Sequence, residues 1–154
     1  MDWLTRIVTE SLDIVTESLS EPVDRAIVAP GREVAWDDCC DGMAWVRVVN
    51  MLPRFSSTET QRQVPCAQIG WDIELGIGVL RCVAVLDDDG NAPYPDQITS
   101  DGLSVIRDAF ELRSLDLTEI KGVLTSRIRR WDPLGPEGGC AGGEFSINVF
   151  TGCI

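Results

Sequence analysis

The chain has 154 residues, with 25 acidic and 13 basic side chains, no histidine and a formal net charge of −12. This length predicts one domain, residues 1–154, that buries enough surface for a core of its own. The absence of histidine excludes Ser-His and Cys-His nucleophile pairs. The acidic balance disfavours sequence-specific DNA binding, which depends on Lys and Arg at the phosphates.

The first predicted element is an amphipathic helix over residues 2–19. Asp2 is placed to cap its N-terminus, and Pro22 limits its extent because the residue before a proline avoids the helical conformation. Apolar side chains recur at helical spacing and form one stripe, made of Leu4, Ile7, Val8, Leu12, Ile14, Val15 and Leu19. We expect this stripe to pack against a sheet.

Two strands are expected next, a short one at residues 26–28 and a longer one at residues 43–52. The longer segment is rich in Trp and Val, which suit a pleated surface. Pro53 is expected to end it. Residues 54–65 are polar and lack periodicity, which is typical of a long loop or an extended hairpin tip.

The clearest strand signal lies at residues 68–85, where the odd positions from Ile69 to Val79 are apolar. The even positions between them include Asp72, Glu74, Gly76 and Gly78. One face of this strand is therefore predicted to be buried, and the other to be wet or unusually close to a neighbour. Because so long a strand is uncommon, we expect a kink near one of the two glycines.

An acidic turn at residues 87–91 precedes a second predicted helix, which runs from about residue 101 to residue 115. Its apolar face consists of Leu103, Ile106, Ala109 and Phe110 and is expected to cover the sheet. A short helix at 117–124, a strand at 128–131 and a long turn at 132–139 follow. A closing strand then runs to Ile154.

Helices and strands are segregated along the chain instead of alternating as βαβ units, which favours the α+β class. We expect a mixed, mostly antiparallel sheet with two main helices packed on one face. The even face of residues 68–79 would then stay open for contacts with other subunits.

Six cysteines lie at positions 39, 40, 66, 82, 140 and 153. Their spacing does not match a zinc site, and a cytosolic chain is expected to keep them reduced, with one or two disulfides formed after release from a cell as the alternative.

Residues 87–90 supply only part of a calcium loop. We therefore expect a non-enzymatic protein with no metal site, no cofactor and no membrane segment.

Three segments resemble a known family. They are residues 34–42 (VAWDDCCDG), residues 71–82 (WDIELGIGVLRC) and the helix over residues 101–110. Together with the order of the elements, they are similar to the tail terminators of long non-contractile-tailed phages, and most of all to those of actinobacterial phages. The strong preference for Arg over Lys agrees with such a source.

The resemblance implies a ring, typically a homohexamer, at the head-proximal end of the phage tail tube. Such a ring contacts the major tail tube protein, ends tube polymerisation and presents a surface to the neck or stopper protein. DNA passes through its lumen without specific binding. The resemblance also implies that the protein resides in the virion, at the junction of tail and neck, and in the host cytoplasm during assembly.

The candidate site residues are surface positions, because the family carries no catalytic residues. Those expected at a subunit or tail interface are Arg54, Phe55, Arg62, Asp72, Glu74, Gly76 and Gly78. Those expected to line the lumen are Asp87, Asp88 and Asp89. The alternatives are another head-to-tail connector, either a stopper or an adaptor, and a small cytosolic protein-binding domain. A metal-dependent enzyme is a third alternative.

Overall fold

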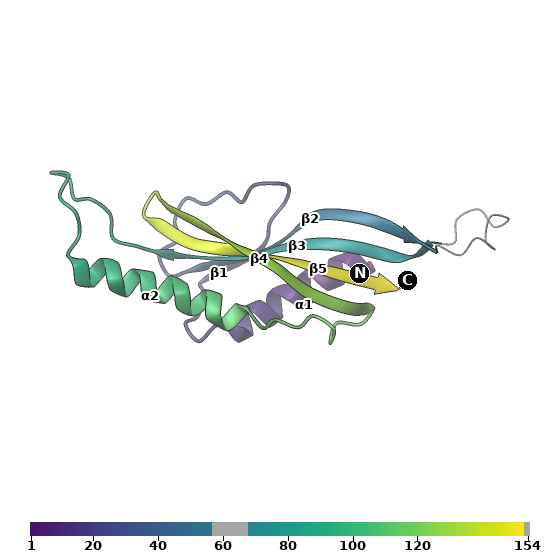
Figure 1. Ribbon diagram of the computed structural model, residues 1–154. Helices are drawn as coiled ribbons and strands as arrows, with labels where there is room; N and C mark the ends of the chain where they lie inside the picture. Colours follow the sequence, from purple (N-terminus) through teal and green to yellow (C-terminus); the bar gives the residue numbers. More distant parts are fainter. Residues whose placement is uncertain (57–67, 153–154) are drawn as a thin grey trace.

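A computed structural model describes residues 1–56 and 68–152 of the chain. It contains a five-stranded sheet in the order β1-β2-β3-β5-β4 and two helices on one face of that sheet (Figure 1). Only β1 and β2 run parallel, and the other neighbouring strands are antiparallel. The predicted class is confirmed: the fold is α+β, with a mixed, mostly antiparallel sheet.

The elements follow one another with clear bounds. They are α1 (Trp3–Ser18), β1 (Arg25–Val28), β2 (Met43–Phe55), β3 (Gln68–Cys82), α2 (Pro95–Leu112), β4 (Val123–Glu137) and β5 (Cys140–Gly152). Figure 1 shows an elongated molecule, in which the 83–94 loop extends from one end and the β2–β3 hairpin extends from the other.

Helix α1 forms as the sequence predicts. The Asp2 carboxylate accepts a hydrogen bond from the Thr5 amide at 2.8 Å, which satisfies one free donor at the helix start. Ile7, Val8 and Val15 are buried against the sheet. They meet the odd positions of β3, including Leu75 and Ile77, so the two sequence periodicities describe the two sides of one core.

The other face of the sheet, which we call the reverse face, carries the even positions of β3. The 29–42 segment between β1 and β2 covers part of it. A second apolar cluster lies there and includes Met43, Trp45 and Leu80, with Val34 and Trp36 packed against it. The sequence analysis predicted that this face stays open, but the chain itself covers part of it.

Several predicted boundaries are wrong for physical reasons. Pro53 does not end β2, because β1 pairs only with the first residues of β2 and leaves one side of Pro53 without a strand. The β3–β5 register has no shift at the glycines of β3, and the shift near Gly76 lies in β2, between Val48 and Asn50. The short helix predicted at 117–124 is absent, since residues 118–122 form turns and β4 begins at Val123. Strand β4 runs on to Glu137, and only Gly138 and Gly139, both with positive φ, form the turn.

Candidate functional site

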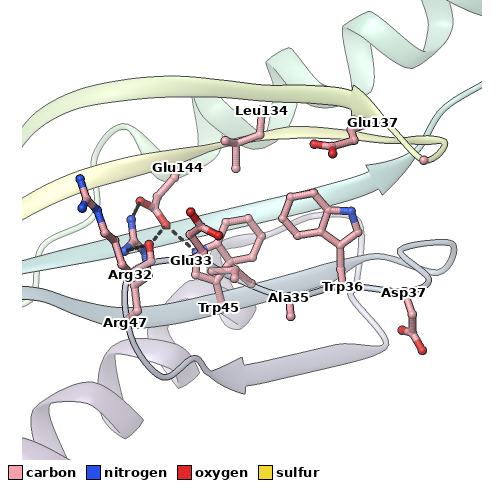
Figure 2. A pocket seen from close by; sticks show the side chains of 12 residues that line it. Arg32, Glu33, Ala35, Trp36, Asp37, Trp45, Arg47, Leu134, Glu137 and Glu144 are labelled. Atoms are coloured by element: carbon pink, nitrogen blue, oxygen red, sulfur yellow. Dashed lines mark hydrogen bonds and ion pairs between the residues drawn. The ribbon is translucent and has the colours of Figure 1, made fainter.

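The centre of the reverse face holds a charged network built by β2 and β5. The Glu144 carboxylate accepts hydrogen bonds from Trp45 Nε1 at 2.7 Å, from Arg47 Nε at 2.9 Å and from Arg47 Nη2 at 2.6 Å (Figure 2). The hydrogen bond to Glu144 raises the pKa of Arg47 above its usual value. Because Arg47 holds the Glu144 carboxylate in place, the hydrogen bond from Trp45 Nε1 to that carboxylate fixes the orientation of the Trp45 ring.

The two glycines of β3 make room for this network. A Cβ atom on Gly78 would lie 2.1 Å from Trp45 Cζ2, and one on Gly76 would lie 2.8 Å from Glu144 Cδ. The close neighbours that the glycines indicated are thus side chains of the same chain. Within this chain Glu144 and Trp45 cover Gly76 and Gly78, and the assignment of the two glycines to a subunit interface stays a prediction.

The other candidate interface residues lie farther along the same face. Arg54 forms a two-point ion pair with Asp72, with Nε–Oδ2 and Nη2–Oδ1 distances of 2.8 and 2.6 Å. The Arg54 guanidinium also lies 4.2 Å from the centre of the Phe150 ring. Glu74 accepts a hydrogen bond from Ser146 Oγ at 2.6 Å. The ion pair joins the two strands near the end of the β2–β3 hairpin.

The end of that hairpin presents apolar side chains. Leu52 and Phe55 are exposed on β2, and Ile69 is exposed on β3. Phe55 therefore stays a candidate contact residue. Arg62, which was assigned to the same interface, lies outside the described residues.

A groove runs between the 32–37 loop and the β4–β5 hairpin, with a volume of about 640 Å³. Figure 2 shows Trp36 pointing from the loop toward the hairpin, with Glu137 beyond it, while Asp37 points away. Glu33 also lines the groove, and Arg32 and the Arg47–Glu144 pair complete its charged lining. An indole face flanked by carboxylates suits a cationic side chain of a partner, by cation–π attraction and ion pairing.

Disulfides fasten the loop that forms this groove. Cys39 is bonded to Cys140, and its neighbour Cys40 is bonded to Cys82. Cys82 and Cys140 lie opposite each other on β3 and β5, so adjacent loop residues reach adjacent strands. The expectation of reduced cysteines is corrected for these four, because sequence spacing gave no sign of this proximity. The remaining two, Cys66 and Cys153, lie outside the described residues.

The acidic turn contains the three candidate lumen residues. Asp87 accepts hydrogen bonds from the Asn91 amide at 2.8 Å and the Asp89 amide at 3.0 Å. The backbone hydrogen bond from Asn91 lowers the pKa of Asp87 below its ordinary value. Asp87 thus shapes the turn, whereas Asp88 and Asp89 stand exposed at one end of the molecule. Among residues 1–56 and 68–152, no group of potential metal ligands gathers there or elsewhere.

Helix α2 lies on the sheet with its polar side inward. Asp108 and Arg81 of β3 form a buried ion pair with Nε–Oδ2 at 2.8 Å, and Arg81 also donates to the backbone oxygens of residues 21 and 22. Nearer the start of the helix, Asp101 accepts from the Ala84 amide at 2.7 Å. These contacts hold the helix by charge and hydrogen bonds and bury few apolar side chains.

The apolar side of α2 consequently faces outward. We call it the apolar stripe: Ile98, Leu103, Ile106 and Phe110. The exposed fractions of Leu103, Ile106 and Phe110 are 56%, 62% and 60%. Of the face predicted to cover the sheet, Ala109 packs against the core, but the prediction is wrong for Leu103, Ile106 and Phe110. The segment after the helix fills the core instead, with Leu115, Leu117, Ile120 and Val123.

Strand β4 forms an edge of the sheet and carries the features that sequence reasoning missed. Residues 121–130 contain four basic side chains, namely Lys121, Arg127, Arg129 and Arg130, and no acidic one. All four are exposed. The signal was present in the charge pattern, since such a run is unusual in a chain of net charge −12.

No described helix is both long and apolar enough to span a membrane. Comparison of this chain with protein-family models and with curated proteins found no match.

Proposed function

We propose that this protein is a structural subunit of a phage tail, which forms a ring at the head-proximal end of the tail tube, ends tube polymerisation and joins the tail to the neck. The chain works by contact with copies of itself and with other particle proteins. It performs no chemical reaction in this role.

The apolar stripe of α2 is the observation that carries this proposal. Three large apolar side chains lie in line on an exposed helix whose opposite side is fixed by an ion pair. Turning the helix over to bury the stripe would break the Arg81–Asp108 pair and leave a buried charge unpaired, which costs about 3–5 kcal/mol. The stripe is thus held outward, where another protein subunit covers it.

The two ends of the molecule suit two different roles, one beside the DNA and one on the tail tube. One end carries exposed Asp88 and Asp89. Repulsion between their carboxylates and the DNA phosphates would keep DNA from binding in the lumen. The other end carries the apolar side chains of the β2–β3 hairpin, including Leu52 and Phe55, which suit packing on the tube. Figure 1 places the loop and the hairpin at opposite ends of the sheet, so the acidic loop stays clear of the surface proposed to pack on the tube.

Support for a phage tail in particular comes from the sequence resemblance, whose architecture agrees with the fold. A leading helix, a long hairpin, a second helix and a closing strand occur in the order that the resemblance implies. Strands make up more of the chain than helices, which supports a terminator over a mainly helical adaptor. The two helices on one face argue against a barrel-like stopper.

Electron microscopy of purified tail tubes, polymerised with and without the protein, tests the proposal. We expect rings with an open centre at one tube end and tubes of uniform length when the protein is present. A variant with Asp88 and Asp89 changed to Asn controls for the acidic loop and should still cap tubes. Tubes of unchanged length, together with a protein that stays monomeric, would instead indicate a small protein-binding domain.

A further inference from the structure

The two edges of the sheet carry opposite charge. The basic β4 edge consists of Lys121, Arg127, Arg129 and Arg130, with no acidic residue among residues 121–130. Strand β4 is the last strand in the sheet order, so its outer backbone groups have no neighbour among the described strands. A long unpaired edge is a surface that native proteins cover, twist away or protect with charge.

The opposite edge, formed by β1, is bordered by acidic groups. Residues 33–41 contain four exposed carboxylates and no basic residue, and of these Asp37 is already paired with Arg25 of β1 at 2.7 Å. Arg32 precedes the segment and is the one basic side chain next to Glu33 in sequence. Helix α1, which packs against β1 and β2, adds two more exposed carboxylates on its outer side. We call this set the acidic β1 surface: Asp13, Glu17, Glu33, Asp37, Asp38 and Asp41.

The basic β4 edge and the loop part of the acidic β1 surface border the reverse face, whereas Asp13 and Glu17 lie on α1, on the other side of the β1 edge. Arg127 lies opposite Asn148, and Arg130 lies opposite Ser146. Directly opposed side chains share a face of the sheet, and Ser146 bonds Glu74 on the reverse face. The 29–42 segment covers the same face from the other edge, where Trp36 packs against the cluster of Trp45 and Leu80.

We propose that the basic β4 edge of one copy docks against the acidic β1 surface of a second copy. Most other pairings of two chains of net charge −12 bring like charges together, so this orientation is selected by repulsion as well as attraction. Arg130 is already paired with Asp132 at 2.8 Å, and Lys121 precedes the strand, so Arg127 and Arg129 are the basic residues of β4 that contact the partner. The groove beside Trp36 and Glu33 receives a guanidinium in this arrangement.

This contact joins two different surfaces, so each docked copy still offers a free β4 edge and a free acidic β1 surface. Repeated contacts of this kind close into a ring when the rotation between copies permits. The inference rests on the proposed ring assembly and names the two surfaces that build it.

Paired charge reversals test the contact. One variant carries Arg127→Glu with Arg129→Glu, and the other carries Glu17→Arg with Glu33→Arg. Each variant alone places like charges at the contact, and we expect its self-association to weaken by about tenfold or more. An equimolar mixture restores opposite charges at every contact and should recover assembly. The matched control, Asp88→Arg with Asp89→Arg, changes the net charge as the second variant does and should assemble like the native protein.

Sedimentation velocity at low and high salt gives the readout, with electron microscopy on tail tubes for assembly that needs the tube. Native assembly that weakens with salt, and a mixture that recovers it, support the contact. If the Glu17→Arg, Glu33→Arg variant assembles normally, or the mixture fails to recover while the native protein forms rings, this inference is overturned and the ring remains. A native protein that is monomeric alone and on tubes overturns both proposals.

Discussion

Gly78 allows the Trp45 side chain to pack flat on the middle of the sheet. The Trp45 ring lies directly over it, and a Cβ atom would approach Trp45 Cζ2 to 2.1 Å. We expect Gly78→Ala to lower the free energy of unfolding by about 1–3 kcal/mol, because the ring cannot move without losing Glu144. Urea unfolding followed by circular dichroism measures this change.

Gly102→Ala is the matched control, since a Cβ at this helical position meets nothing within 4 Å. It should raise the free energy of unfolding by about 0.8–1 kcal/mol through helix propensity. Equal effects of the two substitutions would contradict the packing described for Trp45.

Glu144 is the residue on which the reverse-face network depends. Its side chain and that of Arg47 are 16% and 14% exposed, whereas those of Asp132 and Arg130 are 53% and 72% exposed. We expect Glu144→Gln to lower the free energy of unfolding by about 3 kcal/mol, because Arg47 would keep a largely buried charge without its ion-pair partner. Asp132→Asn removes an ion pair of the same kind at the surface and should cost about 0–1 kcal/mol. Thermal and urea unfolding of both variants measure the two losses. Equal losses would contradict the view that the Arg47–Glu144 pair is buried and the Arg130–Asp132 pair is screened by solvent.

At the scale of elements, the loop between β1 and β2 depends on its two covalent ties. The Cys39–Cys140 and Cys40–Cys82 bonds join positions 101 and 42 residues apart. Reduction should therefore lower the free energy of unfolding by about 2–5 kcal/mol for each bond, because the unfolded chain regains conformational freedom. Urea unfolding with and without a reductant measures the loss, and peptide mapping without reduction identifies the pairs. Rapid alkylation of Cys39 and Cys40 in the native, unreduced protein would contradict the pairing.

The junction between α1 and α2 should respond to acid. Glu111 accepts hydrogen bonds from the hydroxyl and the amide of Ser20, which lower its pKa below the ordinary value. A carboxylate with a depressed pKa stabilises the fold fully above the unfolded pKa of about 4.3 and loses that contribution as pH falls through the folded pKa.

We therefore expect the native protein to exceed the Glu111→Gln variant in stability at neutral pH, and this difference to shrink as pH falls below about 4. Unfolding midpoints measured across this pH range test the linkage. A difference that does not change with pH would show that the hydrogen bonds with Ser20 contribute nothing through the ionised carboxylate.

At the scale of the whole molecule, the outward face of α2 should govern assembly and not folding. Ile106→Asp places a charge in the apolar stripe, where the native side chain is already exposed. We expect the melting temperature to stay within a few degrees of the native value, because no core contact is lost, while association with copies or tubes weakens at least about tenfold.

Ser100→Asp adds the same charge on the flank of the helix, at another exposed position, and should leave association unchanged. Sedimentation velocity and the tube-length assay measure both variants. Loss of association in the Ser100→Asp variant as well would indicate a general effect of charge on the particle and would remove the role of the stripe.

The sequence by itself determined the elements whose pattern is local. The stripe of α1 and the alternation in β3 each fix which side is buried, because helical and strand periodicities place apolar residues on one side of the same element. The cap at Asp2 and the α+β class follow from the same kind of pattern. Residues such as Asp72 and Glu74 were assigned to the correct face for this reason.

Only the tertiary structure decided features that depend on a distant partner. Helix α2 turns its apolar side outward because Arg81, on another strand, holds Asp108 inward, and no periodicity within the helix contains that information. Positions 76 and 78 of β3 require glycine because the side chains of Glu144 and Trp45 lie on them. The adjacent Cys39 and Cys40 can form disulfides with Cys140 and Cys82 because the sheet register places these two strand cysteines side by side. A pattern along one element states which side differs from the other, but the partner that each side meets is determined when the elements pack.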